Sequence, residues 1–347
     1  MTFNTFNNKY LPPQEIDQSF EYFKNLNAKY CPEQKVIGKS VNDLPIHMYS
    51  LGRGQISVLL YSQIHGHEPT STRGLLIFLN QLLASDSGLL DYLKLSIIPQ
   101  VNPDGALAYT RANANNLDLN HDAKNLSQPE SQALAEILKN DKPDYCFSLH
   151  DHRTFHAAGE HGQPSSLAFL APAFDQQLSM NKTRRIVMQI VGIIKEGLTF
   201  NQPVHLAVFN ETYVAGGFGE LAISLNIPSV LMEAGFFNRD YLRHKPAQLI
   251  AQSLSLALQS IADQSFEKQS IEIYQKLPRV KPEYVDFLIK GASFEGDNQL
   301  QNIKDITLFF KEELIDGQVI LYPNVILRED WPNIRGYYNL DLNQPIT

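Results

Sequence analysis

The chain has 347 residues, of which 43% are hydrophobic and 19% charged, so it can bury a sizeable core and wholesale disorder is excluded. At roughly 150 residues per domain, this length predicts about two domains, or one large α/β domain with an appendage. Twenty-nine basic against 37 acidic residues give a net charge of −8, which argues against a nucleic-acid-binding protein. Two cysteines, Cys31 and Cys146, cannot make a disulfide framework or a thiolate zinc site.

The N-terminal segment carries no targeting pattern. MTFNTFNNKYLPPQEIDQ has neither the basic start nor the apolar core of a signal peptide. No run in the chain approaches the roughly 18 apolar residues that a membrane span requires. We therefore expect a cytoplasmic protein without membrane contact, and the sequence leaves its oligomeric state open.

Periodicity predicts an α/β protein over most of the chain. Ile16, Phe20 and Phe23 recur at helical spacing and predict a helix over 13–29. Short apolar runs bounded by turn or polar residues predict strands over 34–39, 45–50, 56–62, 93–99, 144–149 and 228–232. Further helices are expected over 68–85, 129–138, 174–198 and 239–263. Strands alternating with helices of this length favour a layered, mostly parallel sheet.

The pattern changes after about residue 265. Four short segments there are rich in β-forming residues and are separated by Gly, Pro or Asn: SIEIYQKL, YVDFLIKG, DITLFFKEE and GQVILYPNVILRED. No helical period dominates them. We predict an α/β catalytic domain over 1–265 and a small β-rich C-terminal domain over 266–347.

The histidines are unevenly distributed. Seven of the ten fall between residues 65 and 161, and they are His65, His67, His121, His150, His152, His156 and His161. Imidazole is the commonest metal ligand in proteins and the usual proton carrier near neutral pH. The clustering therefore favours a metal site or a proton-transfer site.

Two histidine motifs directly follow predicted strands. In His65-Gly66-His67-Glu68, His65 and Glu68 are three residues apart, so both can reach one ion, although a polar helix cap with surface histidines is the simpler alternative. His150 ends the apolar run at Ser148-Leu149 and projects to the same edge of the sheet. Two histidines and one glutamate make the ligand set of a catalytic zinc. His152 is the alternative to His150 as the third ligand.

Two further features are polar where the flanking sequence is apolar. Glu233 directly follows the predicted strand 228–232. Burying a carboxylate there costs free energy unless the group has a function or a partner such as Arg239. Asn102-Pro103-Asp104-Gly105 predicts a turn, and the polar run over 110–122 predicts a loop held by side-chain hydrogen bonds.

These motifs, in this order, resemble the zinc carboxypeptidase family. The pattern is H-x-x-E, N-P-D-G, R-x-N followed by D-L-N, a strand ending in S-L-H and a strand ending in Glu, and it spans about residues 60–235. It is most similar to short bacterial members such as murein tripeptide amidases. The resemblance implies a mixed, about eight-stranded sheet between helical layers, and one zinc ion held by His65, Glu68 and His150.

The resemblance also implies roles for other residues. Glu233 corresponds to the general base that deprotonates the zinc-bound water and passes the proton to the leaving amine. Arg111 corresponds to the arginine that stabilises the oxyanion. Tyr213 resembles a substrate-contacting tyrosine before a Gly-Gly pair, one residue out of the usual register.

The D-L-N motif departs from the family at its last position. Asn120 is kept, but His121 stands where the family has an arginine that binds the terminal carboxylate of the substrate. A histidine cannot offer the bidentate fork of a guanidinium. Arg153 is a candidate to supply the lost charge, with a solvated surface arginine as its alternative. His67, His121 and His152 leave room for a second metal.

The resulting expectation is a zinc-dependent hydrolase of an amide bond in a small, carboxylate-bearing, peptide-like substrate. The alternative enzyme is an N-acyl amino acid deacylase, similar to succinylglutamate desuccinylase and aspartoacylase, which also carry a β-rich C-terminal domain. A non-catalytic binding protein is the least favoured hypothesis, because all three ligands, Glu233 and Arg111 are present.

Overall fold

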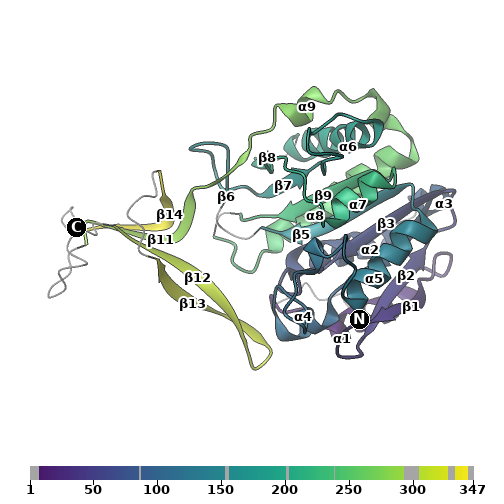
Figure 1. Cartoon of the computed structure of the whole chain (residues 1–347), viewed down its shortest axis with the longest axis horizontal. Coiled ribbons are helices and arrows are strands. Elements are labelled where there is room, and N and C mark those ends of the chain that lie inside the picture. Colours follow the sequence, from purple (N-terminus) through teal and green to yellow (C-terminus); the bar gives the residue numbers. More distant parts are fainter. Residues whose placement is uncertain are drawn as a thin grey trace.

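An eight-stranded mixed sheet with helices on both faces forms the body of the molecule, and a small β-rich part follows it (Figure 1). The computed structural model describes residues 8–85, 87–152, 156–200, 203–237, 239–292, 305–326 and 333–342. The predicted fold class is confirmed. The division of the chain into domains at residue 265 stays a prediction.

The strands of the large sheet follow one another in a crossed-over order. In space they are β1 (Glu33–Lys39), β2 (Pro45–Leu51), β4 (Leu93–Ile98), β3 (Ile56–Ser62), β5 (Tyr145–Asp151), β9 (Ser229–Ala234), β7 (Leu167–Leu170) and β8 (Leu206–Val208). The pairs β4–β3, β3–β5, β5–β9 and β7–β8 are parallel. The pairs β1–β2, β2–β4 and β9–β7 are antiparallel. The parallel centre brings the carboxyl ends of β3, β5 and β9 to one edge.

Helices cover both faces of this sheet. One face packs against α1 (Pro13–Lys24), α2 (Pro69–Ala84), α6 (Lys182–Thr199) and α8 (His244–Ala262). The other face packs against α5 (Pro129–Glu136) and α7 (Phe218–Ser224). Shorter helical segments are α3 (Leu89–Tyr92), α4 (Pro103–Ala108), η1 (Leu119–His121), η2 (Ile137–Asp141), η3 (Ser265–Lys268) and α9 (Glu272–Gln275).

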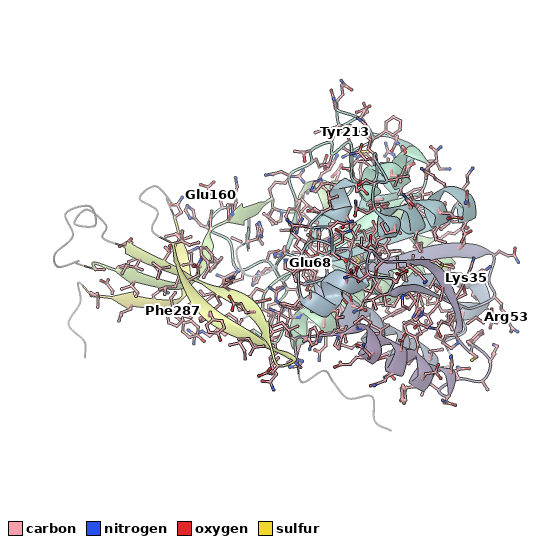
Figure 2. The ribbon with its side chains drawn as sticks, turned by 60° about the horizontal axis from the view of Figure 1, so that its bottom comes forward. Lys35, Arg53, Glu68, Glu160, Tyr213 and Phe287 are labelled. Carbon is pink, nitrogen blue, oxygen red and sulfur yellow. The ribbon has the colours of Figure 1, made fainter. Side chains whose placement is uncertain are left out.

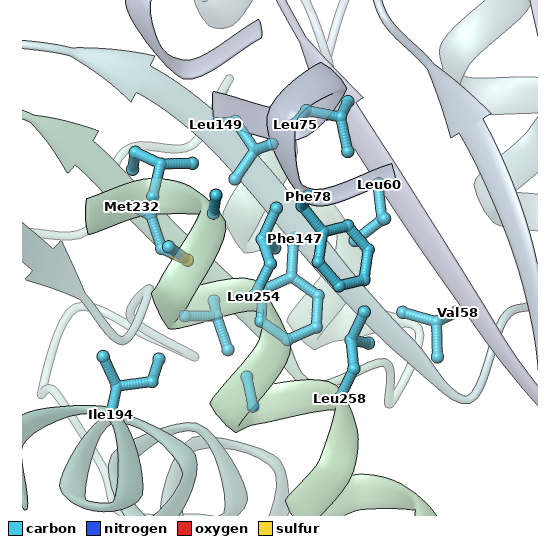
Figure 3. Close-up of a cluster of buried hydrophobic side chains, with 14 of the residues drawn as sticks. Val58, Leu60, Leu75, Phe78, Phe147, Leu149, Ile194, Met232, Leu254 and Leu258 are labelled. Atoms are coloured by element: carbon cyan, nitrogen blue, oxygen red, sulfur yellow. The ribbon is translucent and has the colours of Figure 1, made fainter. Parts of the chain in front are cut away.

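Burial of both faces explains why the central strands read as continuous apolar runs. In β3, Val58 and Leu60 enter the core beneath α2 and α8, whereas Leu59 and Tyr61 enter the opposite core. Phe147 of β5 is fully buried in the first core (Figure 3). A slip of one residue would exchange the two sets of side chains, so the packing supports the register that aligns the strand ends.

Four predicted elements are corrected by the structure. The segment SIEIYQKL was expected to be β-rich, but it contains helix α9, which packs against α6. Helix α6 begins at Lys182 rather than 174, because the Asn181 side chain accepts a hydrogen bond from the Arg184 backbone N–H and caps the helix there. Helix α1 ends at Lys24 rather than 29, and helix α8 begins at His244 rather than 239.

The C-terminal part is a four-stranded sheet that extends away from the body. Its order is β13 (Gln318–Ile326), β12 (Asp305–Ile315), β11 (Tyr284–Lys290) and β14 (Arg335–Asp341). A short strand before it, β10 (Val280–Pro282), pairs with β6 (His156–Ala158) of the body. In the view of Figure 2, Glu68 lies between Phe287 of this sheet and Lys35 on the far side of the body. Within the described ranges, no helix has the length and apolar character that a membrane span requires.

Candidate metal and active site

A pocket of about 400 Å³ opens at the carboxyl ends of β3, β5 and β9. Its described lining residues are His65, His67, Glu68, Arg111, Asn120, His150, Asp151, His152, His156, Phe209 and Glu233. Five of the seven clustered histidines are among them, whereas His121 and His161 are not. The histidine cluster seen in the sequence is therefore, in the main, a cluster in space.

The loop after β3 holds His65 and Glu68 through tight backbone packing. Glu68 directly precedes α2, whose first residue is Pro69. A Cβ at Gly66 would lie 1.9 Å from the carbonyl carbon of Gly105, so only glycine lets this loop lie against the start of α4. Asn102 caps α4 by accepting a hydrogen bond from Gly105 N–H at 2.8 Å. The N-P-D-G segment, expected to be a turn, is thus the start of a helix that supports the H-x-x-E loop.

His150 is held at the end of β5 and lies directly opposite Glu233 in the parallel β5–β9 pair. The next residue, Asp151, is buried, and its carboxylate accepts hydrogen bonds from the backbone N–H groups of Thr70 at 2.8 Å and Ser71 at 2.9 Å. These bonds tie the end of β5 to the first turn of α2, which carries Glu68 at its start. Both histidine motifs are thereby fixed to one rigid unit.

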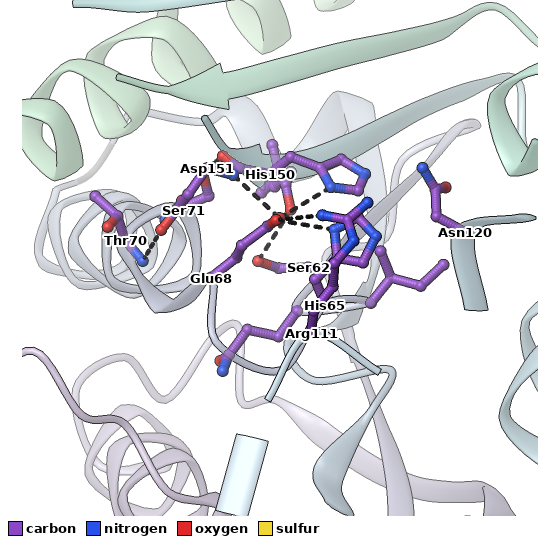
Figure 4. Close-up of polar contacts among 12 residues, drawn as sticks. Ser62, His65, Glu68, Thr70, Ser71, Arg111, Asn120, His150 and Asp151 are labelled. Carbon is purple, nitrogen blue, oxygen red and sulfur yellow. Dashed lines mark hydrogen bonds and ion pairs between the residues drawn. The ribbon is translucent and has the colours of Figure 1, made fainter. Parts of the chain in front are cut away.

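His65, Glu68 and His150 converge as a buried group whose ligand atoms lie within 4.8 Å of one another (Figure 4). The Nδ1 atom of His65 is 2.9 Å from Glu68 Oε1, and the Nδ1 atom of His150 is 3.1 Å from Glu68 Oε2. Two imidazole nitrogens facing one carboxylate are a donor set that fits a zinc ion. His152, the alternative third ligand, lies outside this group, and its ring contacts the rings of His156 and Phe209 at centroid distances of 5.1 and 6.0 Å.

The electrostatics of the group follow from burial and from the neighbouring charges. Burial would lower the pKa of His65, but the Glu68 and Asp118 carboxylates raise it to about 9. Burial lowers the pKa of His150, against the effect of Glu68. Burial would raise the pKa of Glu68, but His65 and His150 hold it well below its usual value.

Arg239, which the sequence suggested as a partner of Glu233, makes its described contacts with other residues. Arg239 donates to the backbone carbonyl of Tyr337 and lies over the ring of Tyr338, 4.3 Å from its centroid, in the C-terminal sheet. Burial, followed by repulsion from Glu68, raises the pKa of Glu233 well above its usual value. A carboxyl group with a raised pKa beside a candidate metal site is suited to carry a proton near neutral pH.

Arg111 reaches the pocket from the polar loop and is anchored by two carboxylates. Its Nε donates to Asp118 Oδ2 at 2.9 Å, and its Nη1 lies 3.4 Å from Glu68 Oε1. The loop itself is braced as predicted, for example by Asn113, whose side-chain oxygen accepts from the backbone N–H groups of Asn115 and Leu117. A half-exposed guanidinium on a rigid loop can face a substrate oxygen.

Of the four predicted substrate-binding residues, one lines the pocket. Asn120 lines the pocket. The side chain of His121 is 57% exposed and does not line it, and Tyr213 is also exposed and outside the lining. Arg153 lies outside the described residues. Substrate-binding roles for these four residues stay predictions.

Sequence reasoning missed several residues of the pocket. Asp118, which contacts both His65 and Arg111, was visible in the D-L-N motif but was given no role of its own. His156, which the sequence placed only in the histidine cluster, begins the short strand β6, and Phe209 directly follows β8; neither strand was predicted. No local pattern connects them with the pocket, because only the sheet order brings these segments together.

The fold and the site together define the class: an α/β protein with a His-Glu-His metal-site candidate at the carboxyl edge of its sheet. A family-wide sequence profile, described as zinc carboxypeptidase, matches residues 20–122. Those residues contain His65, Glu68, Arg111, Asn120 and His121. The match confirms the resemblance to the zinc carboxypeptidase family that the motifs predict, and it supports a metallopeptidase and Zn²⁺ as its metal.

Individual relatives match about a third of the chain. Carboxypeptidase 2 of Trichophyton rubrum is 27% identical over 108 residues, which is 30% of this chain and 20% of that protein. Carboxypeptidase SOL1 of Arabidopsis thaliana is 30% identical over 136 residues, which is 33% of this chain and 28% of that protein. The matched stretch thus spans between about a fifth and about a quarter of the length of these relatives.

Solved structures extend the likeness of the fold. Bovine thrombin-activatable fibrinolysis inhibitor, in complex with tick carboxypeptidase inhibitor, superposes with a TM-score of 0.57 at 18% identity, over 75% of this chain and 98% of that one. The metallo-carboxypeptidase of Burkholderia cenocepacia gives a TM-score of 0.55 at 16% identity, over 74% of this chain and 71% of that one. At these identities the comparison shows a shared fold.

Proposed function

We propose that the protein is a zinc-dependent hydrolase of amide bonds in short peptides, similar to metallocarboxypeptidases. The observation that carries this proposal is the buried His65–Glu68–His150 group with Glu233 opposite His150 in the sheet. The predicted cytoplasmic location and the individual substrate contacts are part of the proposal.

The donor set fits zinc in type, number and orientation. Both imidazoles turn Nδ1 towards the Glu68 carboxylate, and the Nε2 of His65 is 3.0 Å from Asp118 Oδ1. A carboxylate on the outer nitrogen of a ligating histidine fixes its tautomer and increases its basicity. His65, Glu68 and His150 would hold the ion, which when bound would supply a Lewis acid and make water acidic enough to be deprotonated near neutral pH.

Three residues of the chain carry out the other steps of the proposed reaction. Glu233, which lies opposite His150 in the β5–β9 pair, would accept a proton from the attacking water and return it to the leaving amine. Arg111 donates hydrogen bonds to the oxygen that becomes negative in the transition state, and Asp118 holds its guanidinium in place. Asn120, at the rim of the pocket, orients the substrate.

The test combines metal analysis with turnover of short peptides. Purified protein reconstituted with zinc is expected to hold about one ion per chain and to release amino acids from unblocked dipeptides and tripeptides. Glu233→Gln should keep the ion and lose about 10²–10⁴-fold in turnover. Absence of stoichiometric zinc, or undiminished turnover by Glu233→Gln, would contradict the mechanism.

A second candidate is an N-acyl amino acid deacylase. The observation in its favour is the small β-rich C-terminal sheet, which in Figure 2 lies on the side of Glu68 that is opposite Lys35. Assays with N-acyl amino acids beside the peptides separate the two enzymes, because turnover of one class alone eliminates the other. Zinc binding without turnover of either class would indicate a non-catalytic binding protein.

A further inference from the structure

A short loop separates Arg111 from Asp118, and the side chains of these two residues meet at its ends. The Arg111 Nε donates to Asp118 Oδ2 at 2.9 Å, and Figure 4 shows the same guanidinium reaching Glu68 beside the ring of His65. The Arg111 side chain is 49% exposed, so packing around the side chain itself does little to fix it. The path of the loop therefore decides where the guanidinium lies.

That path is set from within by Asn113. Its side-chain Oδ1 accepts hydrogen bonds from the backbone N–H groups of Asn115 and Leu117, both at 3.1 Å. Its own backbone N–H donates to the carbonyl of Leu117 at 3.0 Å, and its carbonyl accepts from Asn116 N–H at 2.9 Å. Asn116 has a φ of 58°, a left-handed conformation that asparagine adopts more readily than most residues. The stretch between the arginine and the aspartate is thus a closed turn.

The same carboxamide attaches this turn to the start of helix α5. Asn113 Nδ2 donates to Gln128 Oε1 at 2.9 Å and to Glu130 Oε2 at 3.3 Å. The three residues are 4%, 6% and 0% exposed. The carboxamide thus uses both its donors and both acceptor positions of its oxygen, away from solvent. Its removal leaves several buried partners unpaired, which costs more than the loss of an exposed contact.

Glu130 is itself fixed to a part of the body outside the pocket. Its Oε1 accepts from the backbone N–H of Val41 at 3.1 Å, in the turn between β1 and β2. Asp104 of α4, the helix before the loop, accepts from the Ser40 hydroxyl at 2.8 Å and from Asn42 N–H at 3.0 Å in the same turn. The β1–β2 turn therefore links the helices that precede and follow the loop. None of these residues is in the described lining of the pocket.

We infer that Asn113 is a positioning residue for Arg111: the four hydrogen bonds of its carboxamide hold the guanidinium within reach of Asp118 and Glu68. This inference rests on the proposed function, in which Arg111 stabilises the oxyanion. Asn113 is neither in the ligand group nor in the described lining of the pocket, so its contribution passes through the loop. A displacement of about 1 Å in a stabilising group can cost about 100-fold in rate.

The first test is a double-mutant cycle on the turnover of unblocked alanine tripeptide by full-length protein at saturating zinc. Asn113→Ala should lower kcat about 10–100-fold with KM unchanged, because the contact to the oxyanion develops in the transition state. In the Arg111→Lys background, the same substitution should cost less than about threefold. Equal losses in the two backgrounds would overturn the inference, because a general disturbance of the fold does not depend on Arg111.

Two further variants locate the effect. Glu130→Gln keeps the size of a buried side chain outside the loop but offers one acceptor oxygen, for which Asn113 and Val41 then compete. It should lower kcat in the same way, and it carries the test if Asn113→Ala does not fold. Asn115→Ala is the matched control, because it removes an exposed side chain of the same turn, which donates to Gln128 Oε1, and keeps the bonds of Asn113. Its kcat should equal that of wild type within about twofold.

A readout apart from turnover is the NMR signal of the Arg111 Nε–H in zinc-loaded protein with isotope-labelled arginine, identified by its loss in Arg111→Lys. Because this N–H donates to Asp118, its chemical shift reports the position of the guanidinium. The signal should move in Asn113→Ala and in Glu130→Gln and stay in place in Asn115→Ala.

The two readouts separate the inference from the proposed function. A signal that stays in place in Asn113→Ala, or in Glu130→Gln where Asn113→Ala does not fold, overturns the positioning role and leaves the hydrolase intact. A signal that moves as expected, in a protein whose wild type hydrolyses no peptide, overturns the proposed function and supports the positioning of Arg111 by Asn113.

Discussion

The carboxylate of Asp118 joins His65 to Arg111: its Oδ1 lies 3.0 Å from His65 Nε2, and its Oδ2 lies 2.9 Å from Arg111 Nε. Burial would raise the pKa of Asp118, but hydrogen bonding to His65 and the charge of Arg111 hold it below its usual value. An ionised Asp118 thus orients an imidazole on one side and a guanidinium on the other. The two residues assigned to metal binding and oxyanion stabilisation depend on one anchor.

Replacing this anchor should weaken both functions. Asp118→Asn keeps the shape of the side chain but removes its charge, so zinc affinity should fall about 10–100-fold, as measured by competition with a coloured chelator. The control is His121→Gln, because His121 is exposed and its Nε2 lies 3.9 Å from Asp118. Equal chelator resistance in Asp118→Asn and wild type would show that Asp118 does not support the site.

Zinc should stabilise the fold through Glu68. Binding to the folded state alone adds about 2.7 kcal/mol to the free energy of unfolding when free zinc is about a hundred times its Kd. Denaturant unfolding with and without zinc should show this gain in wild type and not in Glu68→Gln, since a neutral amide is a poor metal ligand. Asp175→Asn serves as the control, because Asp175 is neither in the ligand group nor in the described lining of the pocket. A gain that survives in Glu68→Gln would place the ion elsewhere.

The extent to which the sequence predicted the molecule differs between the strands and the rest. Strand 56–62 was predicted to the residue, because an apolar run bounded by polar residues identifies a strand buried on both faces. The prediction of a β-rich segment at SIEIYQKL was wrong, because so short an alternation of apolar and polar residues also fits a short helix. This helix, α9, is stabilised by packing against α6. Local pattern decides little where tertiary contact supplies the stability.

The residues of the site also differ in how well the sequence predicted them. His65, Glu68, His150 and Glu233 each end or follow an apolar strand, so parallel topology alone brings them to one edge. His156 begins the three-residue strand β6 and Phe209 directly follows the three-residue strand β8, and strands this short give no recognisable pattern in the sequence. The anchoring of Arg111 by Asp118 depends on the path of a loop, which no periodicity describes.

The role of Arg111 can be separated from that of the metal. Arg111→Lys keeps a positive charge, but one ammonium group cannot bind Asp118 and face a substrate oxygen with the geometry of a guanidinium. We expect kcat to fall about 10²–10³-fold with the zinc content unchanged. Steady-state kinetics with metal analysis provide the measurement. A rise in KM at constant kcat would assign Arg111 to ground-state binding instead.

Phe147 should be among the most sensitive core positions. Its ring is fully buried in the core beneath α2 and α8, in the strand that carries His150. Phe147→Ala should lower the free energy of unfolding by about 3–5 kcal/mol. Leu107→Ala, at a side chain that is 42% exposed, should change it by no more than about 0.5 kcal/mol. Urea unfolding of both variants tests the contrast, and similar losses would contradict the assigned core.

Glu220, in α7, should make the stability of the fold depend on pH. A Cβ at Gly217 would lie 2.1 Å from Glu220 Oε2, so this carboxyl group packs closely against the loop that connects Tyr213 to α7 (Phe218–Ser224). Burial raises the pKa of Glu220 from 4.5 to about 7, although hydrogen bonds from backbone N–H groups oppose the shift. The folded protein therefore holds this proton more tightly than the unfolded chain does.

The sign of the pH dependence follows directly. The stability contributed by protonated Glu220 is fully present below pH 4.5 and is lost as the pH rises through about 7. Glu220→Gln, which mimics the protonated form, should remove this part of the decline, so its free energy of unfolding should fall less than that of wild type between about pH 5 and about pH 8. The control is Glu136→Gln, because Glu136 is exposed on α5. A difference between Glu220→Gln and wild type that stays constant across this range would mean that Glu220 titrates alike in both states.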